Sequence, residues 1–348
     1  MIPYYGLILC MFILYGITRR IRLRDQNKAF VLLAFAAAVL LQSVRARTVG
    51  SDLQEYLRVY GVLKRVPVGR HITTFEFGFE TLLNILAKIG LSEQGVITVL
   101  TLLCQIPVFW FLAKRAKDPA LSVVIYLTFG LFTFSFSGIR QMLAIGIFLL
   151  AILRLDDDHP IQFVLMVLFA ALFHKTVLIC LVAWPLSKVH IRTYTARFLM
   201  LGVFAAELLF GLPVIRFAVS LFGRYNTIEP TGAYLCFVMY AGIWLVSSIF
   251  LPDEAPWNGY VNYMYLAAVI QCLGAYHMSI GRLGYYFAFF ETLLLPEAIE
   301  RATDSVPLKT TLRIGLAAFC LLYFYTNTGW GYLDVSPYLP FWAAAVPA

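Results

Sequence analysis

The sequence has few charged residues for its length. Only 13% of its 348 residues are Asp, Glu, Lys or Arg, whereas 61% are hydrophobic and the mean hydropathy is +0.80. Soluble domains carry about a quarter charged residues, so this composition excludes a soluble protein and predicts an integral membrane protein. The formal net charge of +8 is attributed to membrane topology, because Lys and Arg concentrate in cytoplasmic loops. No basic run alternates with aromatic residues, so we expect no nucleic-acid partner.

Motifs of several enzyme classes and of export are also missing. The chain has no glycine-rich phosphate loop, no Gly-x-Ser-x-Gly elbow and no His-Glu-x-x-His zinc helix. Residues 2–18 form an apolar run with no basic residues before it and four arginines shortly after it. We therefore expect a retained first helix with its C-terminal end in the cytoplasm rather than a signal peptide.

Metal and cofactor chemistry finds little support. The six cysteines lie in apolar spans and lack metal-ligand spacing, so we expect neither a disulfide framework nor a zinc site; they are Cys10, Cys104, Cys180, Cys236, Cys272 and Cys320. The run Asp156-Asp157-Asp158 resembles the acidic metal motif of nucleotide-sugar glycosyltransferases. It lies in a tight predicted cytoplasmic loop, so we expect a solvated turn there, no bound metal and no cofactor.

The apolar segments predict an all-α, polytopic membrane protein, with residues 1–348 forming a single integral membrane domain. Several segments are shorter than the ~20 residues of a full crossing. About twelve spans fit: 2–18, 29–44, 94–113, 119–136, 138–154, 160–173, 175–187, 197–212, 232–251, 258–278, 282–299 and 311–327. With both termini outside, 15 Lys and Arg fall inside and 12 outside, and seven of the outer ones lie in residues 45–93.

Residues 45–93 are predicted to form an extracytoplasmic segment. Residues 75–89 carry apolar side chains at helical spacing with Glu76, Glu80 and Lys88 interspersed, which is typical of a helix lying in the membrane interface. Residues 213–231 are expected to form a second outer loop, which carries Arg216, Arg224, Tyr225 and Glu229.

In this topology the notable polar residues gather at the outer face: Arg45, Arg47, Asp52, Glu76, Arg140, Gln141, His174, Lys175 and Arg282. Ser137-Gly138 precedes Arg140 and favours a helix start with Ser137 as N-cap. Ser279-x-Gly281 precedes Arg282 in a similar way, and His174-Lys175-Thr176 opens another outward-starting helix.

These helix starts predict an anion site. A helix N-terminus offers free N–H groups and a positive dipole end to an anion, and the guanidinium groups of Arg140 and Arg282 match phosphate oxygens. Two such arginines would clamp a pyrophosphate. The alternatives are interfacial snorkelling, or a salt bridge to Glu207 or Glu291.

Three other side chains are candidates for proton transfer. His174 has a near-neutral titration range, although a lone histidine beside an apolar helix also fits a hydrogen-bonded structural role. Asp52 and Glu76 are the carboxylates best placed to deprotonate an acceptor hydroxyl, and each also fits a solvated loop charge.

Five short motifs, in this order, resemble the EpsG-type polysaccharide polymerases, which are related to the Wzy O-antigen polymerases. They are Arg47-x-x-Gly50-Ser51-Asp52-x-x-x-Tyr56, Phe75-Glu76-x-Gly78-Phe79, Ser135-x-Ser137-Gly138-x-Arg140-Gln141-x-x-Ala144, Ala170-x-x-Phe173-His174-Lys175 and Arg282-x-x-Tyr285-Tyr286. The chain departs from the family pattern at Ser51, where threonine is more usual, and at Lys175, where serine or a similar residue is commoner.

The resemblance implies a membrane glycosyltransferase of the GT-C type in the bacterial inner membrane, with its active face in the periplasm. It would move a glycan chain from undecaprenyl pyrophosphate onto a lipid-linked repeat unit, to make O-antigen or exopolysaccharide. Expected partners are these lipid-linked oligosaccharides, membrane lipids and a chain-length regulator. A lipid-linked oligosaccharide flippase and an O-antigen ligase or acyltransferase are the alternatives.

Residue roles follow from combining the two arguments. Arg140 and Arg282 are expected to stabilise the departing pyrophosphate without a metal, with Asp52 or Glu76 as general base and His174 as orienting residue or alternate base. The expected substrate-binding residues are Arg47, Tyr56, Gln141, Lys175, Tyr285 and Tyr286. The tyrosines fit either sugar stacking or the interfacial aromatic belt.

Overall fold

The computed structural model describes residues 1–21, 25–190, 194–222, 234–328 and 332–343. Over these ranges the chain is helical, and its one extended pairing is an isolated bridge between Arg45 and Pro340. The expected all-α class is confirmed. By their internal contacts the residues form two compact units, Met1–Ile179 with Thr310–Ala348, and Cys180–Lys309. The division does not test the prediction of a single membrane domain.

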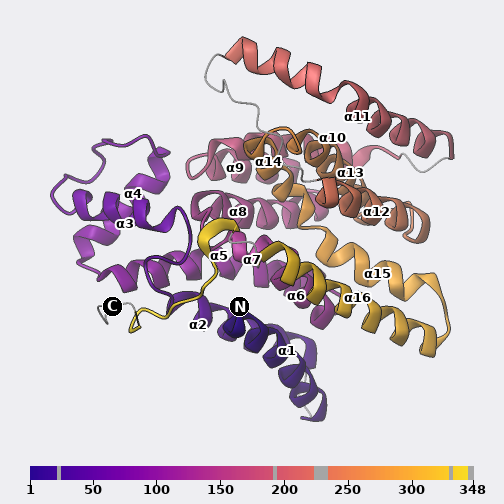
Figure 1. Ribbon diagram of the computed structural model, residues 1–348, viewed down its shortest axis with the longest axis horizontal. Helices are drawn as coiled ribbons and strands as arrows, with labels where there is room; N and C mark the ends of the chain where they lie inside the picture. Colours follow the sequence, from indigo (N-terminus) through magenta and orange to yellow (C-terminus); the bar gives the residue numbers. More distant parts are fainter. Residues whose placement is uncertain (22–24, 191–193, 223–233, 329–331, 344–348) are drawn as a thin grey trace. The chain divides into compact units, whose positions relative to one another are not determined.

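The first unit holds the helices that bear on the site (Figure 1). Its helices are α1 (Ile2–Arg20), α2 (Gln26–Ser43), α3 (Leu53–Leu63), α4 (Phe77–Ile89), α5 (Glu93–Arg115), α6 (Pro119–Thr128), α7 (Leu131–Phe134), α8 (Ile139–Asp156), α9 (Pro160–Ala170), the 3-10 helix η1 (Lys175–Val182), which continues into the second unit, most of α16 (Val306–Thr328), and the 3-10 helix η2 (Tyr332–Asp334). The second unit contains α10 (Ala183–Lys188), α11 (Tyr194–Phe222), α12 (Tyr234–Phe250), α13 (Trp257–Gly274), α14 (Met278–Ala288) and α15 (Glu291–Ala302).

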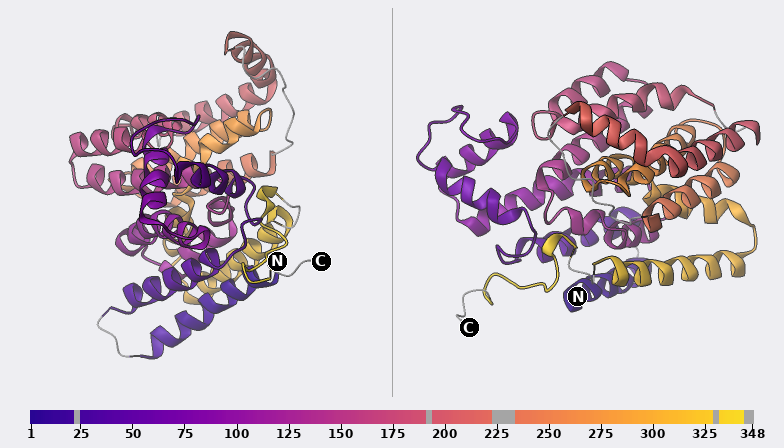
Figure 2. Two further views of the ribbon diagram at one scale, coloured as in Figure 1. Left: turned by 90° about the vertical axis from the view of Figure 1, so that its left-hand side faces the viewer. Right: turned by 45° about the horizontal axis from the view of Figure 1, so that its top comes forward.

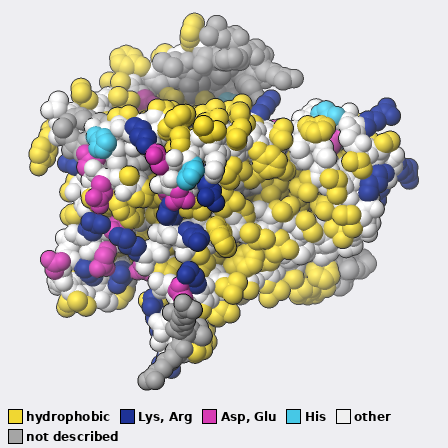
Figure 3. Space-filling view, turned by 180° about the vertical axis from the view of Figure 1, so that it is seen from behind, with side chains coloured by type: hydrophobic (Ala, Val, Ile, Leu, Met, Phe, Trp, Pro, Cys, Tyr) yellow, Lys and Arg dark blue, Asp and Glu magenta, His cyan; other side chains and the backbone are white. Residues whose placement is uncertain are grey.

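Within the described residues, the four helices α1, α2, α5 and α16 are long and apolar enough to cross a membrane. The shorter helices α6, α9 and α12 are also apolar. Large hydrophobic side chains such as Leu9, Leu32 and Trp110 are exposed by 55–64%, and Figure 3 shows broad hydrophobic patches with charged side chains gathered beside them. A polytopic membrane protein accounts for this surface, because lipid is its natural solvent. The count of twelve spans stays a prediction.

Several expected segments differ from the helices observed. The span at 119–136 is interrupted after Thr128, where Gly130 has φ +98°. The span at 282–299 is divided between Ala288 and Glu291. The loop expected at 213–231 is wrong for its first part, because α11 continues through Pro213 to Phe222; neighbouring helices let membrane helices tolerate proline. Arg224, Tyr225 and Glu229 lie outside the described residues.

The C-terminal segment 332–343, yellow in Figures 1 and 2, holds the loop after α2. The Gly50 N–H donates to the Asp334 carbonyl at 3.0 Å and the Ser51 N–H donates to the Leu333 carbonyl at 2.9 Å. Leu333 and Asp334 both have positive φ, which is costly for side chains other than glycine. The two ends of the first unit are therefore joined at the turn that leads into α3.

Ion pairs gather at one end of α8. Arg115 Nε lies 3.0 Å from Asp156 Oδ2, and Arg313 Nη2 lies 3.2 Å from Asp118 Oδ2. Arg140 is near the other end of this 18-residue helix, about 24 Å from Asp156 by helix geometry. The expectation of a solvated turn is wrong at Asp156, whose side chain is only 11% exposed.

We expect Gly50→Ala to destabilise the chain more than Gly69→Ala. Both glycines have positive φ, but a Cβ at Gly50 would lie 2.2 Å from the Phe136 carbonyl oxygen, whereas one at Gly69 meets nothing within 4 Å. Gly69→Ala should cost about 1 kcal/mol of unfolding free energy from backbone strain, and Gly50→Ala about 1–3 kcal/mol more. Thermal unfolding in detergent measures both, and equal melting temperatures would contradict the steric argument.

Candidate functional site

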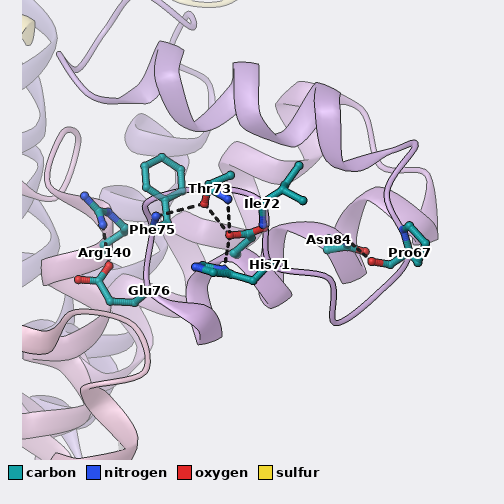
Figure 4. A network of polar contacts seen from close by, with 9 residues as sticks. Pro67, His71, Ile72, Thr73, Phe75, Glu76, Asn84 and Arg140 are labelled. Carbon is teal, nitrogen blue, oxygen red and sulfur yellow. Dashed lines mark hydrogen bonds and ion pairs between the residues drawn. The ribbon is translucent and has the colours of Figure 1, made fainter.

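The Glu76 carboxylate connects three parts of the chain that are distant in sequence. Glu76 is the N-cap of α4, and its Oε2 lies 2.6 Å from Nη1 of Arg140 in α8. Its Oε1 lies 3.2 Å from Nδ1 of His174 and accepts the backbone N–H of Lys175 at 3.3 Å. Figure 4 shows the Arg140 and Glu76 side chains facing each other. The expected meeting of Glu76, Arg140 and His174 is therefore present.

A close backbone contact brings the first turn of α4 to His174. The Gly78 N–H donates to the Leu172 carbonyl at 2.8 Å, and a Cβ at Gly78 would lie 2.7 Å from that same oxygen. Only glycine allows this approach without a shift of the backbone. The close contact with Leu172 therefore explains why the second motif has glycine at position 78.

The Arg140 guanidinium lies between one acid and two aromatic rings. Its guanidinium carbon lies 4.6 Å from the centre of the Phe75 ring and 5.9 Å from that of Tyr56, which are cation–π distances. Nη1 pairs with Glu76, whereas Nε has no hydrogen-bond acceptor among the described residues. The side chain is 24% exposed. The guanidinium is therefore fixed in place, while the side chain remains partly open to a further anion.

The turn before α8 differs from the expected N-cap. Gly138, not Ser137, is the N-cap of α8 and it makes no side-chain cap. The Ser137 hydroxyl instead lies 2.5 Å from that of Ser51 and accepts the Asp52 N–H at 3.2 Å. Ser137 is buried, so the first motif is attached directly to the turn that presents Arg140.

The Asp52 carboxylate lies beside the contact between Ser51 and Ser137 and forms no ion pair among the described residues. Its Oδ1 accepts the Ser51 hydroxyl at 3.2 Å, and its Oδ2 lies 3.5 Å from the Tyr56 hydroxyl. Among the described residues its carboxylate makes no ion pair within 4.0 Å. Tyr56 in turn lies beneath Arg140, so Asp52 and Arg140 share one aromatic neighbour.

Sequence reasoning missed Glu80 as a residue that shapes the site. Its carboxylate is buried and accepts the backbone N–H of Ile72 at 2.7 Å, and the N–H and hydroxyl of Thr73 at 3.2 and 2.6 Å. His71 Nδ1 lies 2.6 Å away. Figure 4 shows this network next to the Glu76–Arg140 pair. The only sequence signal is the i, i+4 spacing of Glu76 and Glu80, which the sequence pattern attributes to the polar side of an interfacial helix.

The pKa of Glu76 reflects its partners. Burial alone raises the pKa of this carboxyl, but the adjoining His174 ring and the Arg140 charge outweigh that effect and lower it from 4.5 to about 2. Glu76 is therefore ionised at neutral pH and holds its proton poorly. A carboxylate in this state suits the positioning of cations better than the acceptance of a proton.

The remaining predicted residues are placed as follows. Arg47 Nη1 lies 3.4 Å from Glu93 Oε2, with both side chains about half exposed. Gln141 is buried, and Lys175 contributes its backbone N–H. In the second unit Arg282 lies in the second turn of α14, not at its first residue, with Tyr285 half-buried and Tyr286 buried.

The acid that pairs with Arg140 is Glu76, so the alternative partners Glu207 and Glu291 are wrong for this arginine. His174 precedes a 3-10 helix, not the α-helix expected there. The meeting of Arg140 with Arg282, and the roles of Gln141, Tyr285 and Tyr286, stay predictions.

A family model described as the EpsG family matches residues 28–339, which is most of the chain. The match spans all five motifs, including those that carry Asp52, Glu76, Arg140 and His174. No curated protein and no solved structure matches the chain.

We expect Glu76→Gln to lower stability in a pH-dependent way. Because the folded-state pKa of about 2 lies below the ordinary 4.5, the pairing stabilises the fold above about pH 4.5 and is lost as pH falls toward 2. The difference in melting temperature between the wild type and Glu76→Gln should therefore shrink over that range. Glu55→Gln is the control, because Glu55 pairs with Arg58 in solvent and should matter little. A difference that stayed constant with pH would contradict the assignment.

Proposed function

The chain belongs to the EpsG family of polysaccharide polymerases, and from that premise we propose that it elongates a bacterial glycan at the outer face of the inner membrane. The donor is a glycan chain on undecaprenyl pyrophosphate, and the acceptor is a hydroxyl of the next lipid-linked repeat unit. The acceptor oxygen attacks C1 of the donor's reducing-end sugar, the bond from C1 to the pyrophosphate oxygen breaks, and the lipid pyrophosphate leaves.

The geometry of Arg140 carries this proposal. A guanidinium near a membrane surface is stabilised here by Glu76 at 2.6 Å and by the Phe75 and Tyr56 rings, and its side chain remains 24% exposed. Negative charge develops on the departing pyrophosphate, and a preorganised cation stabilises charge most where water is excluded. Arg140 would bind this leaving group. Glu76 would hold the Arg140 guanidinium in position, and His174 would orient the Glu76 carboxylate.

Of the two candidate bases, Asp52 fits the proton transfer better. Glu76 is already engaged by Arg140 and His174, which hold its pKa near 2. Asp52 is partly exposed, and among the described residues its carboxylate contacts the hydroxyls of Ser51 and Tyr56 and forms no ion pair. Asp52 would take the proton from the acceptor hydroxyl as the new glycosidic bond forms.

Arg140→Ala should reduce polymerisation of purified lipid-linked repeat units by about 10²–10³-fold, the usual cost of removing one transition-state donor. Arg58→Ala is the matched control, because Arg58 is 64% exposed and pairs with Glu55 in solvent; it should polymerise at the normal rate. Gel analysis of chain length is the measurement. Long chains made at the normal rate by Arg140→Ala would remove the central assignment, and a wild-type product that stayed one repeat long would favour the ligase alternative.

Asp52→Ala should lose about 10²–10⁴-fold in rate, the usual contribution of a general base, and regain part of it when formate is added. Formate supplies a small carboxylate to the space left by the deleted side chain. Glu76→Ala is the comparison, because the loss of a positioning group should be restored much less. Greater rescue of Glu76→Ala than of Asp52→Ala would exchange the roles of the two residues.

A further inference from the structure

The outward face of α4 is apolar. Phe77, Ile85 and Ile89 are exposed by 54%, 43% and 66%, and their spacing of eight and four residues places them on one side of the helix. The opposite side, with Phe79, Leu83 and Leu86, is buried in the first unit. A helix on a water-facing surface presents polar residues on its outer side. The exposed apolar side chains of α4 therefore suit contact with lipid better than contact with water.

The two ends of α4 lie at the ends of other helices. The Gly78 N–H bonds to the Leu172 carbonyl, just beyond α9. At the other end of α4 only residues 90–92 separate Ile89 from Glu93, where the candidate span α5 begins. α5 packs on α8 and α8 packs on α9, so α4, about 20 Å long, crosses the ends of the packed helices. If the candidate span α5 crosses a membrane, a helix in that position runs along its surface.

Basic side chains accompany this apolar face. Lys64, Arg65, Arg70 and Lys88 are all exposed, and the Lys88 ammonium donates to the Lys64 carbonyl at 3.1 Å. Among the described residues none of the four has an acidic partner within 4.0 Å, because the neighbouring acids are engaged elsewhere: Glu55 with Arg58, Glu80 with the 71–73 loop and Glu93 with Arg47. The surplus positive charge complements lipid phosphates.

We propose that α4 is seated on anionic phospholipids, with Phe77, Ile85 and Ile89 facing the acyl chains and Lys64, Arg65 and Lys88 meeting the headgroup phosphates. Apolar burial together with electrostatic attraction is what binds an interfacial helix. Because Glu76 caps α4, this seating fixes the partner of Arg140 at headgroup depth, where a lipid-linked pyrophosphate lies. That last consequence rests on the proposed function; the lipid contact itself does not.

The test uses spin labels on the full chain, reconstituted in phosphatidylcholine vesicles with or without phosphatidylglycerol and with the native cysteines replaced. Ile85→Cys is labelled on α4, and Gln54→Cys, which is exposed on the polar side of α3, is the matched control. The label at residue 85 should collide more with oxygen and less with a water-soluble nickel chelate than the label at residue 54. Equal exposure of both labels to the chelate, or protection of residue 85 from both reagents as at a protein contact, would overturn the proposal.

The charge contribution is tested with a triple variant, Lys64→Gln, Arg65→Gln and Lys88→Gln, in the Ile85→Cys background. Phosphatidylglycerol should deepen the residue-85 label in the parent chain and not in the triple variant. An equal response of both chains would overturn the assignment to anionic lipid. Neither readout uses catalysis, so loss of polymerisation with normal label depth would count against the proposed function alone.

Discussion

The Glu76–Arg140 ion pair is the interaction on which the arrangement of this site depends. A guanidinium that is 24% exposed, close to apolar helices, loses much of its hydration and needs a fixed counter-charge. Glu76 supplies it, and the same carboxylate reaches His174 and the Lys175 backbone. Removing either partner leaves the other charge partly buried and unpaired, which is far more costly than losing a surface pair. The α4 cap, the first turn of α8 and the chain after α9 are therefore constrained together.

This constraint also separates the work of the two carboxylates. A carboxylate engaged by a guanidinium and an imidazole and one bonded to hydroxyl groups suit different roles in one site. Glu76 is held by Arg140 and His174 and keeps a low pKa, so it is ionised at neutral pH and positions its partners. Asp52 is held by hydroxyl groups, with Ser51 and Ser137 fixing its backbone. The serine that replaces the usual threonine at position 51 keeps the one atom that this contact uses.

Local patterns in the sequence predicted the helical class, the position of α4 and the candidate site residues Glu76, Arg140 and His174, which the structure brings together. They did so because apolar spacing and motif order carry that information directly. They missed the break within 119–136, because the residues on both sides of the interruption are equally apolar. They also missed the extension of α11 beyond Pro213. Glu80 was missed for a different reason. Its carboxylate binds backbone N–H groups of residues 72 and 73, and no side-chain pattern records an acceptor for a folded-back loop.

The helix start at Arg140 requires a break in an apolar segment, and a break frees backbone groups that lipid cannot satisfy. The structure resolves this with buried amides. Gln42 Nε2 donates to the Ser135 carbonyl at 2.9 Å, and Gln105 Nε2 donates to the Ser135 hydroxyl at 3.0 Å and to Gln42 Oε1 at 2.7 Å. The Tyr126 hydroxyl completes the network by donating to Gln105 Oε1 at 2.8 Å. Polar groups in such surroundings are tolerated only when they are paired. The side chains from α2, α5 and α6 provide this pairing, so α8 can begin where its arginine faces Glu76.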